Sequence, residues 1–229
     1  GETTVAVQCF ADPQATLPAA LPPLDPPRPD LQAALAEPPD APWAQAPILL
    51  LGMPGGDVER VAALLADQPQ LLVLRDRAAT LLRDDDFNRP RFPYYCGELD
   101  EADREALRER YLAPLRHAGL TLDRPIVDWL PRWDAHLLAL LRRAMPGTRL
   151  LIVARDPRDA LLNWLGFGWS PGFPCTDPVA AADWLARARD HLDFANELDE
   201  PRRLVVAADA LLADPQGAGG ELARFVGIQ

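Results

Sequence analysis

The sequence predicts a three-layer α/β domain built on a mostly parallel, doubly wound sheet. Two observations carry this prediction. Short runs of apolar residues alternate with longer amphipathic runs, and the first apolar run leads through glycines into a helix. Short apolar runs bounded by proline and glycine suit strands that are covered on both faces. With 229 residues, 48% of them hydrophobic, the chain is long enough to bury one such core.

Five apolar segments are predicted to be strands: Ile48 to Leu51, Leu71 to Leu74, Ile126 to Val127, Leu150 to Ala154 and Leu204 to Ala207. The first and fourth are unbroken apolar runs, so we expect them to be buried, parallel neighbours. Helices are predicted from apolar positions at helical spacing and from end signals. They are Asp57 to Asp67, Leu99 to Ala118, Ala135 to Ala144, a helix that starts over Asp159 to Leu165, Val179 to Leu198 and Gly220 to Val226.

Many of the 25 prolines fall near the start of the chain. Proline fixes φ and removes a backbone donor, so such a stretch builds no core of its own. We predict a Pro-rich N-terminal segment or linker over residues 1–46 and a compact domain over residues 47–229. The segment should lie extended against the domain or link it to an upstream domain. Deleting residues 11–46 should leave a cooperative unfolding transition.

Composition excludes several classes of function. The formal net charge of −11 argues against a nucleic-acid surface. No apolar run approaches the roughly 20 residues that span a bilayer, so we expect no membrane segment. Cys9, Cys96 and Cys175 lack CxxC or zinc spacing, which favours a reducing cytoplasm and no metal site. All 23 basic residues are arginine, which excludes any mechanism that needs a lysine ammonium.

The first predicted strand, its loop and its helix carry a recognisable pattern. The strand is followed by Gly52-Met53-Pro54-Gly55-Gly56-Asp57, and the helix by Gln68-Pro69-Gln70. This resembles the opening of a family of bacterial sulfotransferases often fused to tetratricopeptide repeats, which reads strand, G-M-P-R-S-G-T-T-L-V-E, helix, H-P-Q. In that family the loop wraps the 5′-phosphosulfate of PAPS (3′-phosphoadenosine-5′-phosphosulfate). The resemblance implies that Gly52, Pro54, Gly55 and Gly56 would contact the cofactor.

The loop departs from the family between its two ends. Six family residues, R-S-G-T-T-L, become Gly55-Gly56-Asp57, so the arginine and both threonines are absent. Asp57 places a carboxylate where backbone amides and the helix dipole would attract an anion. Two interpretations stay open: a weakened cofactor site, or a helix that the Asp57 side chain caps without a ligand.

A second pattern follows the fourth predicted strand. Arg155-Asp156-Pro157-Arg158-Asp159 resembles the family's R-D-P-R-D, which implies that Arg155 holds the cofactor's 3′-phosphate, with Asn163 in place of the family's serine. Alternatively, Arg155 forms an ion pair with Asp156 or Asp159 at the start of the next helix. Trp129 stands where the family's D-K-M-P has lysine, and we expect it to pack in the core.

The resemblance also implies one candidate catalytic base. Counting from Gln68-Pro69-Gln70, Asp76 matches a glutamate that could accept the proton of the acceptor hydroxyl. Arg75 and Arg77 flank Asp76, so a solvated salt-bridge network is the other interpretation.

Over residues 47–229 the resemblance implies a P-loop-like sulfotransferase fold, with the differences concentrated at cofactor contacts. We therefore expect a sulfotransferase-like domain with lost or much reduced binding of PAPS or its bisphosphate product. It would act as a binding or scaffolding module for a protein partner or an upstream repeat domain. Two alternatives stay open. One is an atypical PAPS-dependent enzyme that moves a sulfuryl group to a hydroxyl, with Arg132 or Arg158 supplying the missing cation. The other is a different transferase or an anion-binding protein on the same fold.

Overall fold

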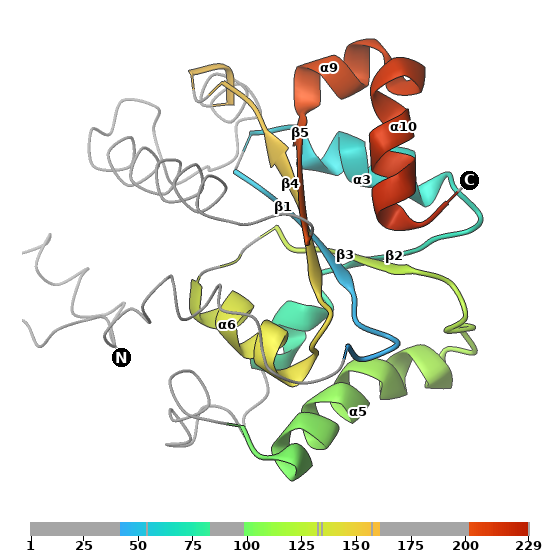
Figure 1. The fold of residues 1–229 in the computed structure, drawn as a ribbon, viewed down its shortest axis with the longest axis vertical. Coiled ribbons are helices and arrows are strands. Elements are labelled where there is room, and N and C mark those ends of the chain that lie inside the picture. The colour runs from blue at the N-terminus through green and yellow to red at the C-terminus, as the bar shows by residue number, and fades with distance from the viewer. Residues whose placement is uncertain are drawn as a thin grey trace, which may run out of the picture.

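The structure is a computed structural model that describes residues 42–53, 55–82, 99–131, 133, 135–156, 158–160 and 202–228. The strands in these residues form one parallel sheet of five in the order β2-β3-β1-β4-β5 (Figure 1). They are β1 (Ile48–Gly52), β2 (Leu72–Arg75), β3 (Ile126–Trp129), β4 (Arg149–Ala154) and β5 (Arg203–Ala207). The fold is therefore α/β, as predicted.

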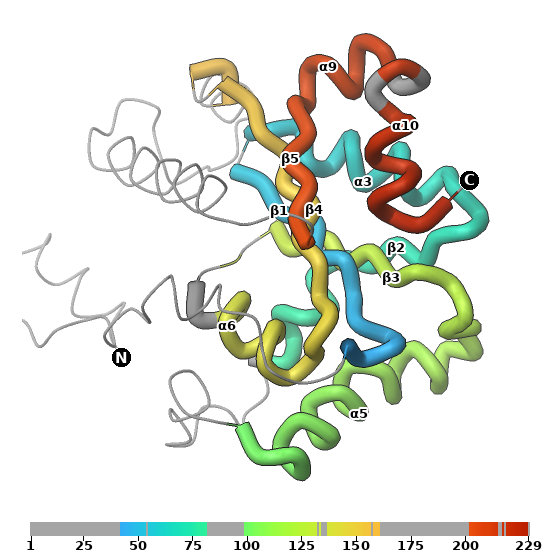
Figure 2. The backbone as a smooth tube through the Cα atoms, viewed as in Figure 1, coloured from blue at the N-terminus to red at the C-terminus, as the bar shows by residue number. Residues whose placement is uncertain are grey.

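The two unbroken apolar runs lie side by side at the centre of the sheet (Figure 2). β1 pairs with β4 in parallel, from Ile48 opposite Arg149 to Gly52 opposite Val153. All five β1 residues are buried, which accounts for the absence of any polar position in that run. The prediction that these strands are buried, parallel neighbours is confirmed.

Helices cover both faces of the sheet (Figure 1). One face carries the 3₁₀ helix η1 (Ala78–Leu82), α5 (Glu101–His117) and α6 (Ala135–Ala144), and the other carries α3 (Val58–Ala66), α9 (Ala208–Ala213) and α10 (Pro215–Val226). Successive β1 residues alternate between them, because side chains of a strand point to opposite faces. Leu49 and Leu51 join the core under α5 and α6, whereas Ile48 and Leu50 join the core under α3.

Some element bounds differ from those predicted. Helix α10 begins at Pro215 rather than Gly220, because the Asp214 carboxylate accepts a hydrogen bond from Gly217 N–H at 2.9 Å and proline fits the first turn. Helix α9 was not predicted. The predicted helix at 159–165 is described only as far as residue 160, and the one at 179–198 lies outside the described residues.

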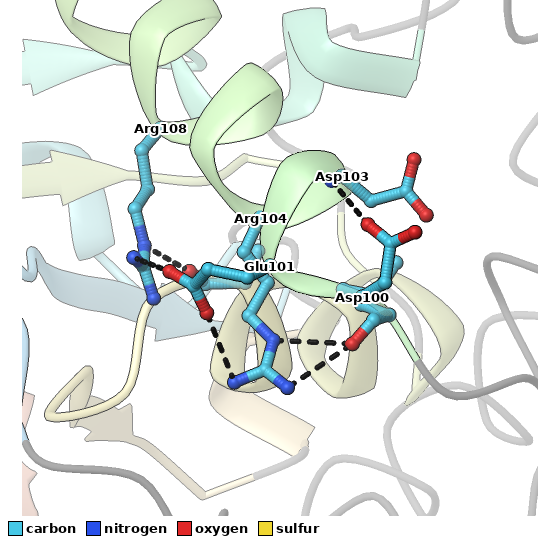
Figure 3. A network of polar contacts seen from close by, with 7 residues as sticks. Asp100, Glu101, Asp103, Arg104 and Arg108 are labelled. Atoms are coloured by element: carbon cyan, nitrogen blue, oxygen red, sulfur yellow. Dashed lines mark hydrogen bonds and ion pairs between the residues drawn. The ribbon is translucent and has the colours of Figure 1, made fainter.

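A network of polar contacts fixes the start of α5 (Figure 3). The Asp100 carboxylate accepts from the Asp103 amide at 2.8 Å, and Arg104 donates to the carbonyl of Leu99. Arg108 pairs with Glu101 at 2.9 Å and also donates to the Ala144 carbonyl at 2.7 Å. Arg108 thus ties α5 to the last carbonyl of α6, where a cation is favourable.

No helix in the described part of the chain is long and apolar enough to cross a membrane.

Candidate functional site

The loops that follow β1 and β4 meet at the carboxyl edge of the sheet, because these two parallel strands are neighbours. Gly52 ends β1 at a point where no side chain fits. A Cβ there would lie 2.2 Å from Val58 Cγ2 and 3.1 Å from the Val153 carbonyl oxygen. Glycine at this position therefore allows α3 and β4 to approach the end of β1 closely.

The first loop is a tight turn that closes on itself. Gly56 N–H donates to the Met53 carbonyl at 2.9 Å, and Gly55 has a φ of 78°. A Cβ on Gly56 would lie 2.9 Å from that same carbonyl oxygen. Both glycines are thus required by the turn itself, and the Gly56 amide is already used within it. Pro54 lies outside the described residues.

Asp57 occupies the N-cap position of α3, but its side chain caps no amide. Of the two interpretations of this loop, the one in which the Asp57 side chain caps the helix is wrong. Asp57 adopts a left-handed backbone with φ 61° and ψ 23°, whereas a capping residue ordinarily has extended backbone. Its carbonyl accepts from the amides of Arg60 and Val61, at 3.1 and 3.2 Å, and these bonds start the helix.

The Asp57 carboxylate instead forms an ion pair with the Arg155 guanidinium, directly after β4. Arg155 Nη2 also lies 3.5 Å from Asp209 Oδ1 at the start of α9. We call Asp57, Arg155 and Asp209 the Arg155 cluster. The side chains of Asp57 and Arg155 are only 8% and 16% exposed, so their attraction is less screened by water than that of a surface pair.

Arg155 does not form the pair that the sequence suggested with Asp156 or Asp159. The Asp156 carboxylate accepts from the Arg158 amide at 2.8 Å, and this hydrogen bond is the main cause that lowers the pKa of Asp156. Asp156 therefore caps the start of the next helix. Arg155, directly after β4, instead contacts the start of α3 through Asp57 and the start of α9 through Asp209. Asn163 lies outside the described residues.

Asp76 follows β2 directly, with a left-handed φ of 59°. Its amide donates to the Trp129 carbonyl at 2.7 Å. The two flanking guanidinium groups make contacts of their own: Arg75 lies 4.6 Å from the centroid of the Trp129 ring, and Arg77 donates to carbonyls of α5. Trp129 itself is buried, as predicted. Since β3 and β1 lie between β2 and β4, roughly 14 Å of sheet separates the ends that carry Asp76 and Arg155.

Sequence reasoning missed Asp128, a fully buried carboxylate on β3. It accepts from the amides of Arg77 at 3.0 Å and Ala78 at 2.6 Å, and from the Tyr111 hydroxyl at 3.1 Å. Burial raises the pKa of Asp128 to about 6, although these hydrogen bonds oppose the shift. The available signal was a charged residue inside an apolar strand, which must find partners when it is buried.

Among the residues that the structure describes, no three His, Cys, Asp or Glu side chains are grouped so that they could hold a metal ion.

No protein-family profile matches the chain, and no curated protein sequence does. Solved structures resemble it at low sequence identity. The sulfotransferase domain of the Synechococcus PCC 7002 olefin synthase is 17% identical with a TM-score of 0.58, over 83% of this chain and 76% of that one. The sulfotransferase from Alicyclobacillus acidocaldarius is 13% identical with a TM-score of 0.56, over 82% of this chain and 83% of that one.

Mouse sulfotransferase SULT7A1, solved in complex with PAP, is 13% identical with a TM-score of 0.52. The likeness covers 81% of this chain and 59% of the mouse chain, so this chain spans little more than half the length of that enzyme. At these identities the likeness concerns the fold, which can carry many functions. The chain has the P-loop-like α/β fold of the sulfotransferases.

Proposed function

We propose that this protein is a sulfotransferase-like domain that has lost most or all of its affinity for PAPS and its bisphosphate product. It serves instead as a binding or scaffolding module for a protein partner. The observation that carries the proposal is the first loop. Its Gly56 amide bonds to the Met53 carbonyl within the same turn, and the buried Asp57 carboxylate at its end pairs with Arg155. The Gly56 amide and the Arg155 guanidinium, two groups that would face the cofactor's anionic ends, both have partners within the chain.

The loop residues do not fit a phosphosulfate. A phosphate-binding loop presents several free amides to its anion, whereas the Gly56 amide bonds to the Met53 carbonyl. The Asp57 carboxylate lies at the start of α3, where it would repel a dianion. Because the cofactor's anionic groups find like charge and no open amide at Gly56, the geometry favours weak binding or none.

One observation favours the second candidate, an atypical sulfotransferase. Transfer of a sulfuryl group needs a cation near the bridging oxygen, and buried Trp129 replaces the lysine that would supply it. The Arg75 guanidinium lies over the Trp129 ring, 4.6 Å from its centroid, and so offers a cation beside the residue that replaces the lysine. Arg158 is 90% exposed and pairs with Asp156, and Arg132 lies outside the described residues. If the chain is an enzyme, Arg75 is therefore the first residue to replace.

Calorimetric titration of the full chain with adenosine 3′,5′-bisphosphate tests the proposal. We expect no saturable heat at ligand concentrations up to about 0.1 mM. As a matched control, Arg-Ser-Gly-Thr-Thr-Leu replaces Gly55 to Asp57, which restores the family's loop length and cation. This variant should bind, and Arg155→Ala in the same background should abolish the gain.

Micromolar binding of the bisphosphate by the unmodified chain would reject the proposal in favour of the enzyme. In that event, PAPS-dependent sulfuryl transfer to hydroxyl acceptors should fall in Arg75→Gln and not in Arg116→Gln, a change of the same type on the outer face of α5.

A further inference from the structure

We infer that Asp57 is an internal substitute for an oxyanion, and that the Arg155 cluster is a latent binding site for phosphate or sulfate that this carboxylate keeps closed. The inference rests on the proposed function, because it gives the loss of cofactor binding a reversible cause within one residue. The shared chemistry of the ligand is a tetrahedral oxyanion with at least two oxygens free to accept hydrogen bonds.

The Arg155 cluster and the neighbouring Arg60 together carry no net charge. Arg155 pairs with Asp57 and lies 3.5 Å from Asp209, while Arg60 Nη1 lies 4.0 Å from the Asp57 carboxylate. Two guanidinium groups thus face two carboxylates, and the net charge is zero. Removal of Asp57 leaves one net positive charge at this edge of the sheet.

Burial makes the Arg155 charge dependent on its carboxylate partner. Arg155 is only 16% exposed, and its Nε is buried with no hydrogen-bond partner among the described residues. Breaking a buried ion pair by removing one partner is costly, because the other charge stays out of water without compensation. Without Asp57, the remaining carboxylate, Asp209, is more distant and is 62% exposed, so it screens Arg155 weakly. An oxyanion from solution would then be favoured at the position that the Asp57 carboxylate occupies.

The shape of the Arg155 guanidinium suits an oxyanion as well as it suits the Asp57 carboxylate. A guanidinium presents donors in a planar fork that matches the oxygens of phosphate or sulfate as well as those of a carboxylate. The start of α3, a helix of nine residues, lies beside Arg155 through Asp57 and adds a favourable dipole for an anion. Carboxylate and oxyanion therefore compete for the same donors, and the carboxylate wins because it is held there by the chain.

The backbone dictates which substitution opens the site. Asp57 has a φ of 61°, a conformation that is strained for a β-branched residue such as threonine and free of strain for glycine. Asp57→Gly removes both the charge and the volume of the side chain, whereas Asp57→Asn removes the charge alone and also tolerates this φ. Asp67→Gly is the matched control, since it deletes an exposed aspartate at the other end of α3.

The experiment is thermal unfolding of the full chain during titration with inorganic phosphate and, separately, with sulfate, at an ionic strength held constant with NaCl. Asp57→Gly should unfold at a lower temperature than the unmodified chain without anion, and either anion should restore much of the difference. We expect its half-saturating anion concentration to be at least about tenfold lower than that of the unmodified chain or Asp67→Gly. Asp57→Gly combined with Arg155→Met should lose the response.

A response of Asp57→Gly no larger than that of Asp67→Gly would overturn the inference, and so would an equally strong response of the unmodified chain. If Asp57→Gly does not fold, Asp57→Asn takes its place, with a smaller response that still requires Arg155; absence of that response also overturns the inference. The proposed function fails on a different measurement, micromolar binding of the bisphosphate by the unmodified chain. The two failures are therefore distinguishable.

Discussion

Asp57 and Asp76 are the non-glycine residues of the described chain that have positive φ, at 61° and 59°. Aspartate visits this left-handed region more readily than most residues because its short polar side chain can form local hydrogen bonds. Each stands at the carboxyl edge of the sheet, Asp57 at the end of the first loop and Asp76 directly after β2. The backbone as well as the charge therefore selects the residue at both positions.

A third carboxylate, Asp128, makes stability depend on pH. Its pKa is raised from 3.8 to about 6, chiefly by burial and secondarily by the charge of Asp76, while the amides of Arg77 and Ala78 and the Tyr111 hydroxyl lower it. Between about pH 4 and pH 6, the Asp128 carboxyl therefore keeps its proton in the folded state, whereas the unfolded chain has lost it. The free energy of unfolding is highest below about pH 4 in respect of this group, and it falls by on the order of 3 kcal/mol as the pH rises to about 6.

Urea unfolding of the full chain at a series of pH values between 3.5 and 7.5 measures this effect. Asp128→Asn should remove the part of the pH dependence that falls between pH 4 and 6, whatever its effect on absolute stability. Asp123→Asn removes the same charge at an exposed position before β3, and should leave that slope in place. An unchanged slope in Asp128→Asn would contradict the assignment of this titration to Asp128.

At the scale of elements, the apolar strands are what the sequence reveals most directly. The strands β1 and β4 were predicted correctly because a strand covered on both faces is usually a continuous apolar run. The predicted strand at 126–127 is shorter than β3, because Asp128 interrupts the apolar run. The burial of Asp128 depends on the Tyr111 hydroxyl, which comes from helix α5. The predicted start of helix α10 lies too late in the chain, because the glycines at 217, 219 and 220 weaken the helical pattern after Asp214 and Pro215.

Helix α5 contains Pro114, which has no N–H to donate to the Arg110 carbonyl four residues earlier. The guanidinium of Arg77 supplies the missing donor: Nη2 donates to the Arg110 carbonyl, and Nε donates to the Tyr111 carbonyl at 3.0 Å. Arg77→Met keeps most of the apolar stem but removes these donors. We expect it to lower the free energy of unfolding by about 2 kcal/mol, because charge-assisted hydrogen bonds to part-buried carbonyls are lost.

A double-mutant cycle with Pro114→Ala tests this mechanism. An alanine amide at position 114 can bond to the Arg110 carbonyl, so Arg77→Met should cost about 1 kcal/mol less in that background. Arg116→Met, on the same helix but 51% exposed and paired with Glu109, should change stability by less than about 0.5 kcal/mol. Purely additive effects of the changes at positions 77 and 114 would count against the proposed role of Arg77.

At the scale of the whole molecule, the sequence predicted the layers and the edge where the site lies, but not the chemistry of the site. Asp57 and Arg155 were both candidates, each for its own local reason. Their ion pair joins residues 98 positions apart and depends on β1 and β4 being neighbours and on the left-handed backbone of Asp57. The spacing of residues along the chain shows neither that these strands are neighbours nor that Asp57 has a left-handed backbone. Local patterns thus predict which residues reach the edge of the sheet, and only the assembled sheet shows which of them neutralise one another.

The boundary of the domain is also decided by contacts between distant parts of the chain. Trp43 belongs by sequence to the Pro-rich segment, yet its backbone N–H donates to the Pro146 carbonyl at 2.6 Å and its ring lies 5.7 Å from the Arg108 guanidinium.

A chain that begins at Pro42 should therefore unfold cooperatively with the stability of the full chain. A chain that begins at Pro47 should still fold but lose about 2 kcal/mol, since an aromatic contact and a cation–π pair disappear. Urea unfolding of both truncations, with Trp43→Ala in the longer one, separates the tryptophan from the rest of residues 42–46. Equal stability of the two truncations would show that the domain begins at Pro47, as the proline pattern alone suggests.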